Sequence, residues 1–471
     1  MKSYGLAVTL TDPSAPAPTA EPRPRLLSPA YAATTIGMFA LIAFSAFEAT
    51  AVTTVMPGVA RELHGIELYA LSFAAPLASG VVGMVAAGAR SDRHGPVGPL
   101  TAALVLFAAG LVVCGTAPSM EVLVAGRVLQ GLGGGAMTVC LYVVVGLVFP
   151  AVLQPAVFAS FAAAWVLPSL FGPALAAFVA HAFGWRWVFL GVVALVAAST
   201  LLILPALRGL PPREGAGESS RSRLAWAVVG AVAVLALELL GSHRGAVGLL
   251  AVVALAVVFL SLRRMLPAGA LVARRGLPAV IGTRGLLSAS FFCAEAYIVF
   301  VLQDRWGLTP GTAGLALTAV GLVWAGSSQV QSRLGPRVSD VAAMRWGTAL
   351  VLAGTAALVL VVVADAPPVL AMAAYVLAGA GMGFGYPRTG VAMLAASTDA
   401  DRGFNSSALS IADSLGGALA LSLSGIVFGA ATRAGADPFV SVFALATGIA
   451  VLGVVTASRA GTAVRTATRR R

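Results

Sequence analysis

Charged side chains are scarce in this chain. Only 10% of its 471 residues are Asp, Glu, Lys or Arg, whereas 59% are hydrophobic and the mean hydropathy is +0.94. Soluble domains carry about 25% charged residues, so this composition excludes an ordinary soluble globular protein. Apolar runs of roughly 20 residues, the length that crosses a hydrocarbon layer of about 30 Å as a helix, recur along most of the sequence. The composition therefore predicts a membrane protein.

Cysteine and histidine are also few, with three and four copies. The cysteines fall inside predicted spans without metal-ligand spacing, and the histidines fall in or beside four different loops: Cys114, Cys140, Cys293, His64, His94, His181 and His243. We expect no metal site, no cofactor and no His-based catalytic cluster. With no soluble domain and no nucleotide-binding loop either, a membrane-embedded enzyme or sensor is the remote alternative.

The hydropathy pattern predicts an all-α protein with fourteen spans. We expect helices at about 33–57, 67–88, 98–117, 121–149, 153–181, 187–207, 224–241, 246–262, 278–303, 309–332, 344–364, 368–395, 404–432 and 438–458. The pair at 224–241 and 246–262 is the shortest, so twelve spans plus a hydrophobic hairpin is the alternative. Either number leaves both termini on one side.

Polar linkers divide the chain into six, two and six helices. The expected parts are a disordered cytoplasmic arm at 1–32, a six-helix bundle at 33–207, a linker with two inserted transmembrane helices at 208–277, a second six-helix bundle at 278–458 and a basic cytoplasmic tail at 459–471. Two segment pairs, LQGLGGGA with LAGAGMGF and SLFG with SLGG, occupy corresponding helices of the two bundles. They indicate related halves, although small residues at close spacing are also explained by tight helix contact alone.

Basic residues predict the orientation. With the N-terminus inside, cytoplasmic segments hold 22 of the 30 Lys and Arg residues and external loops hold five. The positive-inside rule then places both termini in the cytoplasm. The net charge of +12 is spread over short loops and the tail, so we expect a lipid-facing or solvated role and no nucleic-acid partner.

The loop GARSDRHGPVGPL at 88–100 carries a recognisable motif. Through Gly88, Asp92, Arg93 and Gly95 it resembles the GxxxDRxG signature of the major facilitator superfamily. The resemblance implies a gate that closes the cytoplasmic side, with Asp92 docked at the N-terminal end of the helix that opens in 401–410 and with Asn405 or Ser406 as its cap.

Two further segments strengthen the resemblance. RVLQGLGGGA is similar to the RxxQGxGxG segment of the family, with Arg127 and Gln130 inside a span, and LPSLFGPALAA retains Gly172 and Pro173 of a longer glycine-rich motif. Arg127 has two equal interpretations, a structural ion pair or a part in proton coupling. Pro173 predicts a bend in its helix, which would serve gating.

The segment EATAVTTVMP at 48–57 and the hexapeptide GWRWVF at 184–189 resemble the fourteen-helix drug:proton antiporters of this superfamily. The resemblance implies a multi-pass protein of the plasma membrane, monomeric, with protons, lipid and a small-molecule substrate as its partners. The expected function is a proton-coupled exporter of drugs or similar amphipathic molecules by alternating access. A narrow-specificity metabolite exporter, or a proton symporter of the same fold, is the alternative.

Acidic residues inside spans are the candidates for proton coupling, because an ionised carboxylate in lipid is costly. We expect Glu48 and Glu295, at comparable depth in the first helix of each half, to carry protons, although either could be a paired structural charge. Glu238 lies near the end of an inserted helix, where we expect it to snorkel to the interface. For Asp413 we expect helix contacts or gating.

Polar and aromatic side chains inside spans are the candidates for a substrate cavity. Stacking and cation–π contacts would suit flat lipophilic cations, while arginines would favour anions, so the preferred substrate charge stays open. The candidates are Gln130, Trp165, Tyr297, Trp324, Tyr386 and Arg388.

Overall fold

The structure is a computed structural model that describes residues 26–29, 31–150, 152–208, 221–241, 246–398 and 401–462. Within these residues it contains fourteen α-helices, short 3-10 turns and no strand. Most of the predicted arm, residues 209–220 and 242–245 of the predicted linker and the last nine residues of the tail lie outside the described ranges. The helices are α1 (Ala32–Glu62), α2 (Tyr69–His94), α3 (Val97–Gly115), α4 (Met120–Val148), α5 (Gln154–Phe183), α6 (Arg186–Arg208), α7 (Arg221–Gly241), α8 (Ala246–Met265), α9 (Leu277–Asp304), α10 (Pro310–Leu334), α11 (Asp340–Val363), α12 (Pro368–Ala395), α13 (Arg402–Arg433) and α14 (Pro438–Arg459).

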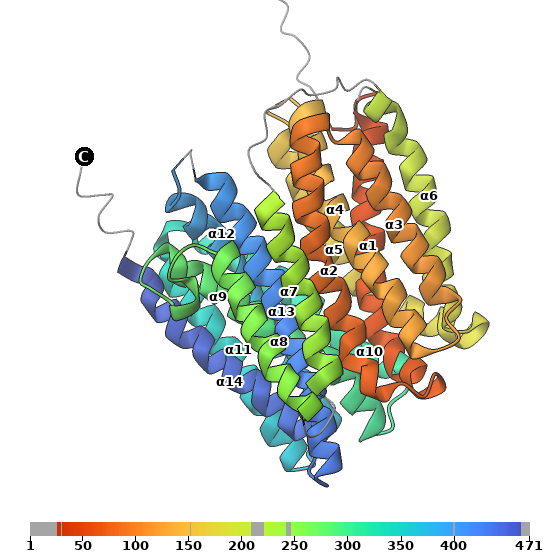
Figure 1. Ribbon diagram of the computed structural model, residues 1–471, viewed down its shortest axis with the longest axis vertical. Coiled ribbons are helices and arrows are strands. Elements are labelled where there is room, and N and C mark those ends of the chain that lie inside the picture. The colour runs from red at the N-terminus through yellow and green to blue at the C-terminus, as the bar shows by residue number, and fades with distance from the viewer. Residues whose placement is uncertain are drawn as a thin grey trace, which may run out of the picture.

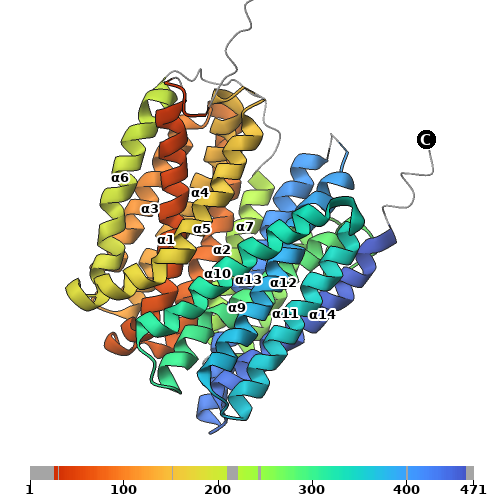
Figure 2. The same ribbon diagram turned by 180° about the vertical axis from the view of Figure 1, so that it is seen from behind.

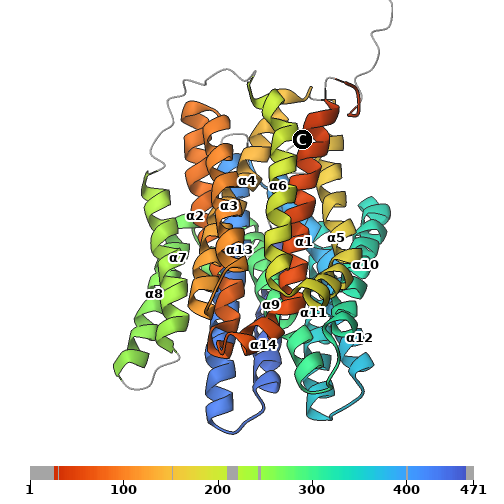
Figure 3. The ribbon, with the colours of Figure 1, turned by 90° about the vertical axis from the view of Figure 1, so that its right-hand side faces the viewer.

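The predicted all-α membrane architecture is confirmed. Thirteen of these helices are long and apolar enough to cross a membrane, and the fourteenth, α8, is 20 residues long and packs along α7. Helices α1–α6 form one bundle and α9–α14 a second, each with its own internal contacts (Figures 1 and 2). The inserted pair lies at one side of the molecule, where α7 contacts α2 of the first half and α13 of the second (Figure 3).

Glycines hold α4 and α12 close to two neighbours in each half. A Cβ on Gly131 would overlap α2 and a Cβ on Gly133 would overlap α3. In the second half a Cβ on Gly383 would overlap α10 and a Cβ on Gly381 would overlap α11. The similarity between the two glycine-rich segments therefore reflects one packing arrangement used twice.

The halves meet along two seams, between α2 and α13 and between α5 and α10. On α5, a Cβ at Gly172 would lie 2.6 Å from Oγ1 of Thr50 on α1, and Pro173 packs against Gly314 on α10. The motif residues thus bring α5 against both halves. Pro168 and Pro173 both lie inside one continuous helix.

The bundle has two ends, the Asp92 end and the Glu67 end, which differ in the turns they hold. The Asp92 end holds the α2–α3 turn and the start of α13, and it is uppermost in Figure 1. The Glu67 end holds the α1–α2 turn and the end of α13. At the α2–α3 turn Gly95 has a φ of 78°, a conformation that favours glycine and fixes where α2 ends.

Candidate functional site

A buried ion pair joins α1 to α4 in the first half. Nη1 of Arg127 donates to Oε1 of Glu48, and Nε2 of Gln130 donates to the same oxygen over 3.3 Å. Nε of Arg127 donates to the carbonyl oxygen of Ser72 on α2, at 2.9 Å. Glu48 and Arg127 are each 5% exposed. The pair lies near the middle of α1, because α1 continues past its predicted end at 57 to Glu62.

Glu295 occupies the corresponding place in the second half, with a different partner. It lies next to Tyr375, which precedes the second glycine-rich segment by two residues, as Arg127 precedes the first. Among the described residues Glu295 makes no ion pair. The Tyr375 ring stacks on Phe291 with centroids 5.4 Å apart. An acid and a phenol thus stand where the first half has an acid and a guanidinium.

A second charged cluster joins α9 to α13. Nε of Arg284 donates to Oδ1 of Asp413 at 2.8 Å, the Tyr386 hydroxyl donates to Oδ2 at 2.9 Å, and Ser288 also donates to Oδ1. The guanidinium lies over the Tyr386 ring, 3.2 Å from its centroid. Sequence reasoning did not select Arg284 and left Asp413 to helix contacts or gating. The available signal was an Arg and an Asp inside two spans of the same half, which each need a partner.

A cavity of about 870 Å³ lies between the halves. Residues of the last turn of α2 and of the first turns of α7 and α13 line it, so it opens at the Asp92 end. Its lining is Ile42, Ser45, Met84, Val85, Gly88, Ala89, Asp92, Met137, Thr138, Val139, Tyr142, Phe158, Phe161, Trp165, Arg223, Tyr386, Gly403, Ser406, Ser407, Ser410, Ile411, Asp413 and Ser414. The volume falls in the range that holds drug-sized ligands.

The two walls of this cavity differ in chemistry. The first half contributes an aromatic wall, in which Phe158 and Phe161 pack edge to face and Tyr142 stacks on Phe161. The second half contributes serine hydroxyls along α13 and the carboxylate of Asp413. Ser45 on α1 also lines the cavity, and Glu48 follows it by one turn, so the buried pair lies about 4.5 Å further along the helix axis.

Two of the predicted gate residues, Gly88 and Asp92, line the mouth of the cavity. Asp92 is exposed and Gly88 faces the cavity one turn earlier, opposite Gly403 on α13. Among the described residues Asp92 makes no ion pair, and Arg93 beside it is partly buried. This geometry leaves the mouth open.

The predicted cap of α13 is wrong. The helix begins at Arg402, with Asp401 at the N-cap position and no side-chain cap. Asn405 is buried in the first turn and donates to the Ser397 hydroxyl at 2.9 Å, while Ser406 lines the cavity. The helix starts two residues earlier than expected, so both side chains fall inside it.

The predicted cavity residues separate into two groups. Trp165, which is 50% exposed, and Tyr386 line the cavity. The others lie elsewhere among the described residues: Gln130 in the buried cluster, Trp324 packed against Phe291 and Tyr386, Tyr297 at the Glu67 end and Arg388 in an ion pair with Asp340 at 2.8 Å.

Aromatic rings and polar bonds hold the halves together at the Glu67 end. Tyr69 of α2 donates to the carbonyl oxygen of Ala296 and packs against the rings of Tyr297 and Phe300. Nη2 of Arg61 donates to Oε1 of Gln303 at 3.2 Å. The described structure is therefore closed at the Glu67 end and open at the Asp92 end.

Glu238 does not snorkel. It is 4% exposed, because α7 turns this side chain inward against α2 and α13. The apolar sequence of α7 does not indicate which face of this helix packs against the rest of the protein, so the sequence alone did not predict the burial of Glu238.

A model of the Major Facilitator Superfamily matches residues 38–387. A probable multidrug-efflux transporter of Mycobacterium tuberculosis is 27% identical over 454 residues, which cover 91% of this chain and 94% of the relative. A multidrug transporter of Bacillus subtilis is 24% identical, with 84% of this chain and 74% of the relative covered.

Solved structures show the same arrangement of helices. A POT family transporter in complex with 5-aminolevulinic acid superposes with a TM-score of 0.68 at 15% identity, covering 91% of this chain and 97% of that one. The xylose transporter of Escherichia coli, in a partially occluded inward open conformation, superposes with a TM-score of 0.60 at 15% identity, covering 90% and 97%. At this identity the likeness concerns the fold.

Proposed function

The chain belongs to the Major Facilitator Superfamily, and from this premise we propose that it is a proton-coupled transporter that exports small amphipathic molecules. The observation that carries the proposal is the cavity with one aromatic and one hydroxyl-rich wall, next to a buried carboxylate. The names of the efflux relatives support export as the direction.

We infer that the Asp92 end faces the cytoplasm of a cell-membrane protein. The support is the distribution of basic residues along the sequence, 22 of 30 of which fall in the segments predicted to be cytoplasmic. In this orientation the described structure corresponds to an inward-facing state, which would receive substrate from the cytoplasm or from the inner leaflet. The seams at the Glu67 end would separate in the outward-facing state.

The cavity walls support the substrate class. Aromatic rings such as Phe161 and Trp165 would cover the flat apolar side of a ligand, and Asp413 with the α13 serines would bind its polar side. Because Arg284 already neutralises Asp413, polarity matters more than net charge in this proposal. That balance would admit substrates of varied structure.

The buried cluster supports proton coupling. Arg127 and a proton compete for the negative charge of the Glu48 carboxylate, so protonation of Glu48 would free Arg127 to rearrange its bonds to Gln130 and Ser72. Such a rearrangement would move α4 relative to α1 and α2. Glu295 would offer a second protonatable site without a competing cation.

The test is uptake of a lipophilic cationic dye into inside-out vesicles under an imposed pH gradient. We expect the dye to dissipate the gradient with the wild-type chain and not with Glu48→Gln, which retains dye binding. Glu121→Gln, an exposed carboxylate at the Glu67 end, is the matched control and should behave as wild type. A gradient indifferent to dye, or dissipated equally by Glu48→Gln, overturns the proposal.

A further inference from the structure

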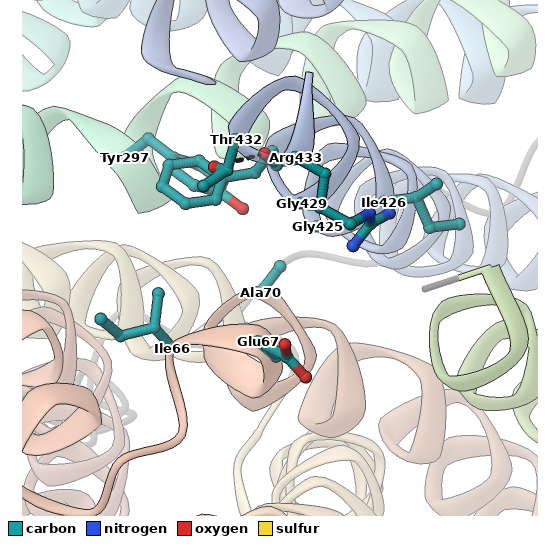
Figure 4. A pocket seen from close by; sticks show the side chains of 10 residues that line it. Ile66, Glu67, Ala70, Tyr297, Gly425, Ile426, Gly429, Thr432 and Arg433 are labelled. Atoms are coloured by element: carbon teal, nitrogen blue, oxygen red, sulfur yellow. Dashed lines mark hydrogen bonds between the residues drawn. The ribbon is translucent and has the colours of Figure 1, made fainter. Parts of the chain in front are cut away.

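A small pocket of about 130 Å³ lies at the Glu67 end of the seam between α2 and α13 (Figure 4). The exposed side chains of Glu67 and Arg433 stand at its rim, and Tyr297 points its hydroxyl into it from α9. One water needs about 10–15 Å³ of such volume, so the pocket has room for several. It therefore offers water a route into the seam from this end.

Glu238 of α7 lies directly behind the wall of this pocket. Ala70 of α2 and Gly425 of α13 both line it. A Cβ built on Gly425 would be 2.6 Å from Oε1 of Glu238 and 2.9 Å from Cβ of Ala70. The absence of a side chain at Gly425 thus creates the space that the carboxyl group occupies. A small separation of α2 from α13 would join this space to the pocket.

Among the described residues the carboxyl group has no counter-ion in the closed seam, and the Ser422 hydroxyl and the backbone N–H of Leu71 lie beside it. Both of its oxygens are buried without a hydrogen bond, and the nearby Ser422 hydroxyl donates to the carbonyl oxygen of Val234 at 3.3 Å. Burial of an ionised carboxylate without a donor or a cation is strongly unfavourable, whereas the neutral acid is tolerated.

The charged and titratable groups around Glu238 do not supply a counter-ion. Tyr297 faces it from α9, while Glu67 lies in the turn before α2 and Arg433 at the solvent end of α13. On the described part of α8 the ionisable residues are Arg263 and Arg264, at the opposite end of that helix. Ionisation of Glu238 therefore requires water.

We propose that Glu238 is a proton-binding site that controls closure of the seam between α2 and α13. The carboxylate becomes hydrated when the seam opens, and it takes a proton from the water at the Glu67 end before the seam closes again. This role rests on the proposed proton-coupled alternating access. It gives the inserted helix α7 a part in that cycle, because α7 brings Glu238 to both halves.

The test is a distance measurement by pulsed electron paramagnetic resonance in nanodiscs. Thr116→Cys and Ala436→Cys, both exposed and outside the pocket, carry one spin label on each half at the Glu67 end. The three native cysteines are buried. In the wild-type background we expect the longer distance to gain population as the pH rises, by up to about tenfold per pH unit, the limit for one linked proton.

In Glu238→Gln and in Glu238→Met we expect the short distance at every pH, because both side chains are neutral. Two variants keep the test valid if one fails to fold, and Glu121→Gln is the matched control. A wild type without a pH response, or an unchanged response in both Glu238 variants, overturns the inference. If Glu48→Gln removes the pH dependence of the distance and neither Glu238 variant does, the inference fails and the proposed function stands. Unchanged dye-driven proton flux in Glu48→Gln defeats the proposed function instead.

Discussion

The two halves place an acid at corresponding positions and surround it differently. In the first half Glu48 is bound by Arg127 and Gln130, whereas in the second half Glu295 lies next to Tyr375 and makes no ion pair among the described residues. The helices around them pack alike, with glycines bringing α4 and α12 close to their neighbours. The halves therefore share packing and differ in electrostatics.

This difference separates two ways to keep an acid inside a membrane protein. A buried ion pair is held by attraction between charges, and removal of one partner leaves the other charge unpaired. A lone carboxyl group is tolerated when neutral, so its loss leaves no orphan charge. The comparison predicts unequal consequences for substitutions in the two halves.

The second half still carries an arginine, but on a different face. Arg284 pairs with Asp413 where the side chains are 15% and 20% exposed, at the cavity, while the side chains of Arg127 and Glu48 are 6% and 7% exposed. The exposed pair can meet a ligand, and the buried pair can respond only through its own helices. One half thus carries its ion pair in the protein interior and the other carries it at the cavity surface.

The largest expected effect is that of Arg127→Met. It leaves the Glu48 carboxylate buried without a cation, and loss of one partner of a buried pair costs about 3–5 kcal/mol. We expect a strongly lowered melting temperature in detergent, measured by tryptophan fluorescence. No comparable loss should follow Glu295→Gln or Tyr375→Phe.

The double variant Arg127→Met with Glu48→Gln is the control for that prediction. If the orphan charge is the cause, the double variant should recover most of the lost free energy of unfolding. Equal melting temperatures for the single and double variants would mean that lost packing of the long Arg127 side chain is responsible. The difference in stability between variants of the two halves would then come from side-chain packing and not from charge.

An intermediate effect is expected for Glu295→Gln. No buried cation is left unpaired, so the free energy of unfolding should change by less than about 1 kcal/mol. If Glu295 carries a proton, dye-driven proton flux in vesicles should fall at least about tenfold, because proton transfer by a positioned side chain contributes that much or more. Wild-type flux would assign coupling to the first half alone.

The sequence predicted the helices more fully than their contacts. The span at 368–395 matches α12, whereas α1 and α2 each continue by five or six residues beyond their predicted ends. Hydropathy identifies the apolar stretch that a bilayer covers. The helices continue beyond it into polar residues such as Glu62 and His94, which lower the hydropathy average and so fall outside the predicted spans.

The site residues were predicted in part for a similar reason. Glu48 and Arg127 were selected because each is charged inside a span, but one sequence leaves open whether they touch each other. The inward orientation of Glu238 and the pairing of Arg284 with Asp413 depend on how helices from distant segments rotate against one another. Composition and spacing along one helix do not contain that information.

Tyr375→Phe is the smallest change that sharpens the comparison between the halves. The hydroxyl is buried beside Glu295 and its removal costs at most one weak hydrogen bond, so the free energy of unfolding should change by no more than about 1 kcal/mol. The stacked ring that packs on Phe291 is retained. We therefore expect a wild-type melting temperature and wild-type proton flux, in contrast to Arg127→Met at the corresponding position.

If Tyr375→Phe lowers proton flux as far as Glu295→Gln does, the phenol must donate to the carboxylate during the transport cycle. The second half would then hold its acid through a neutral partner that serves in place of an arginine.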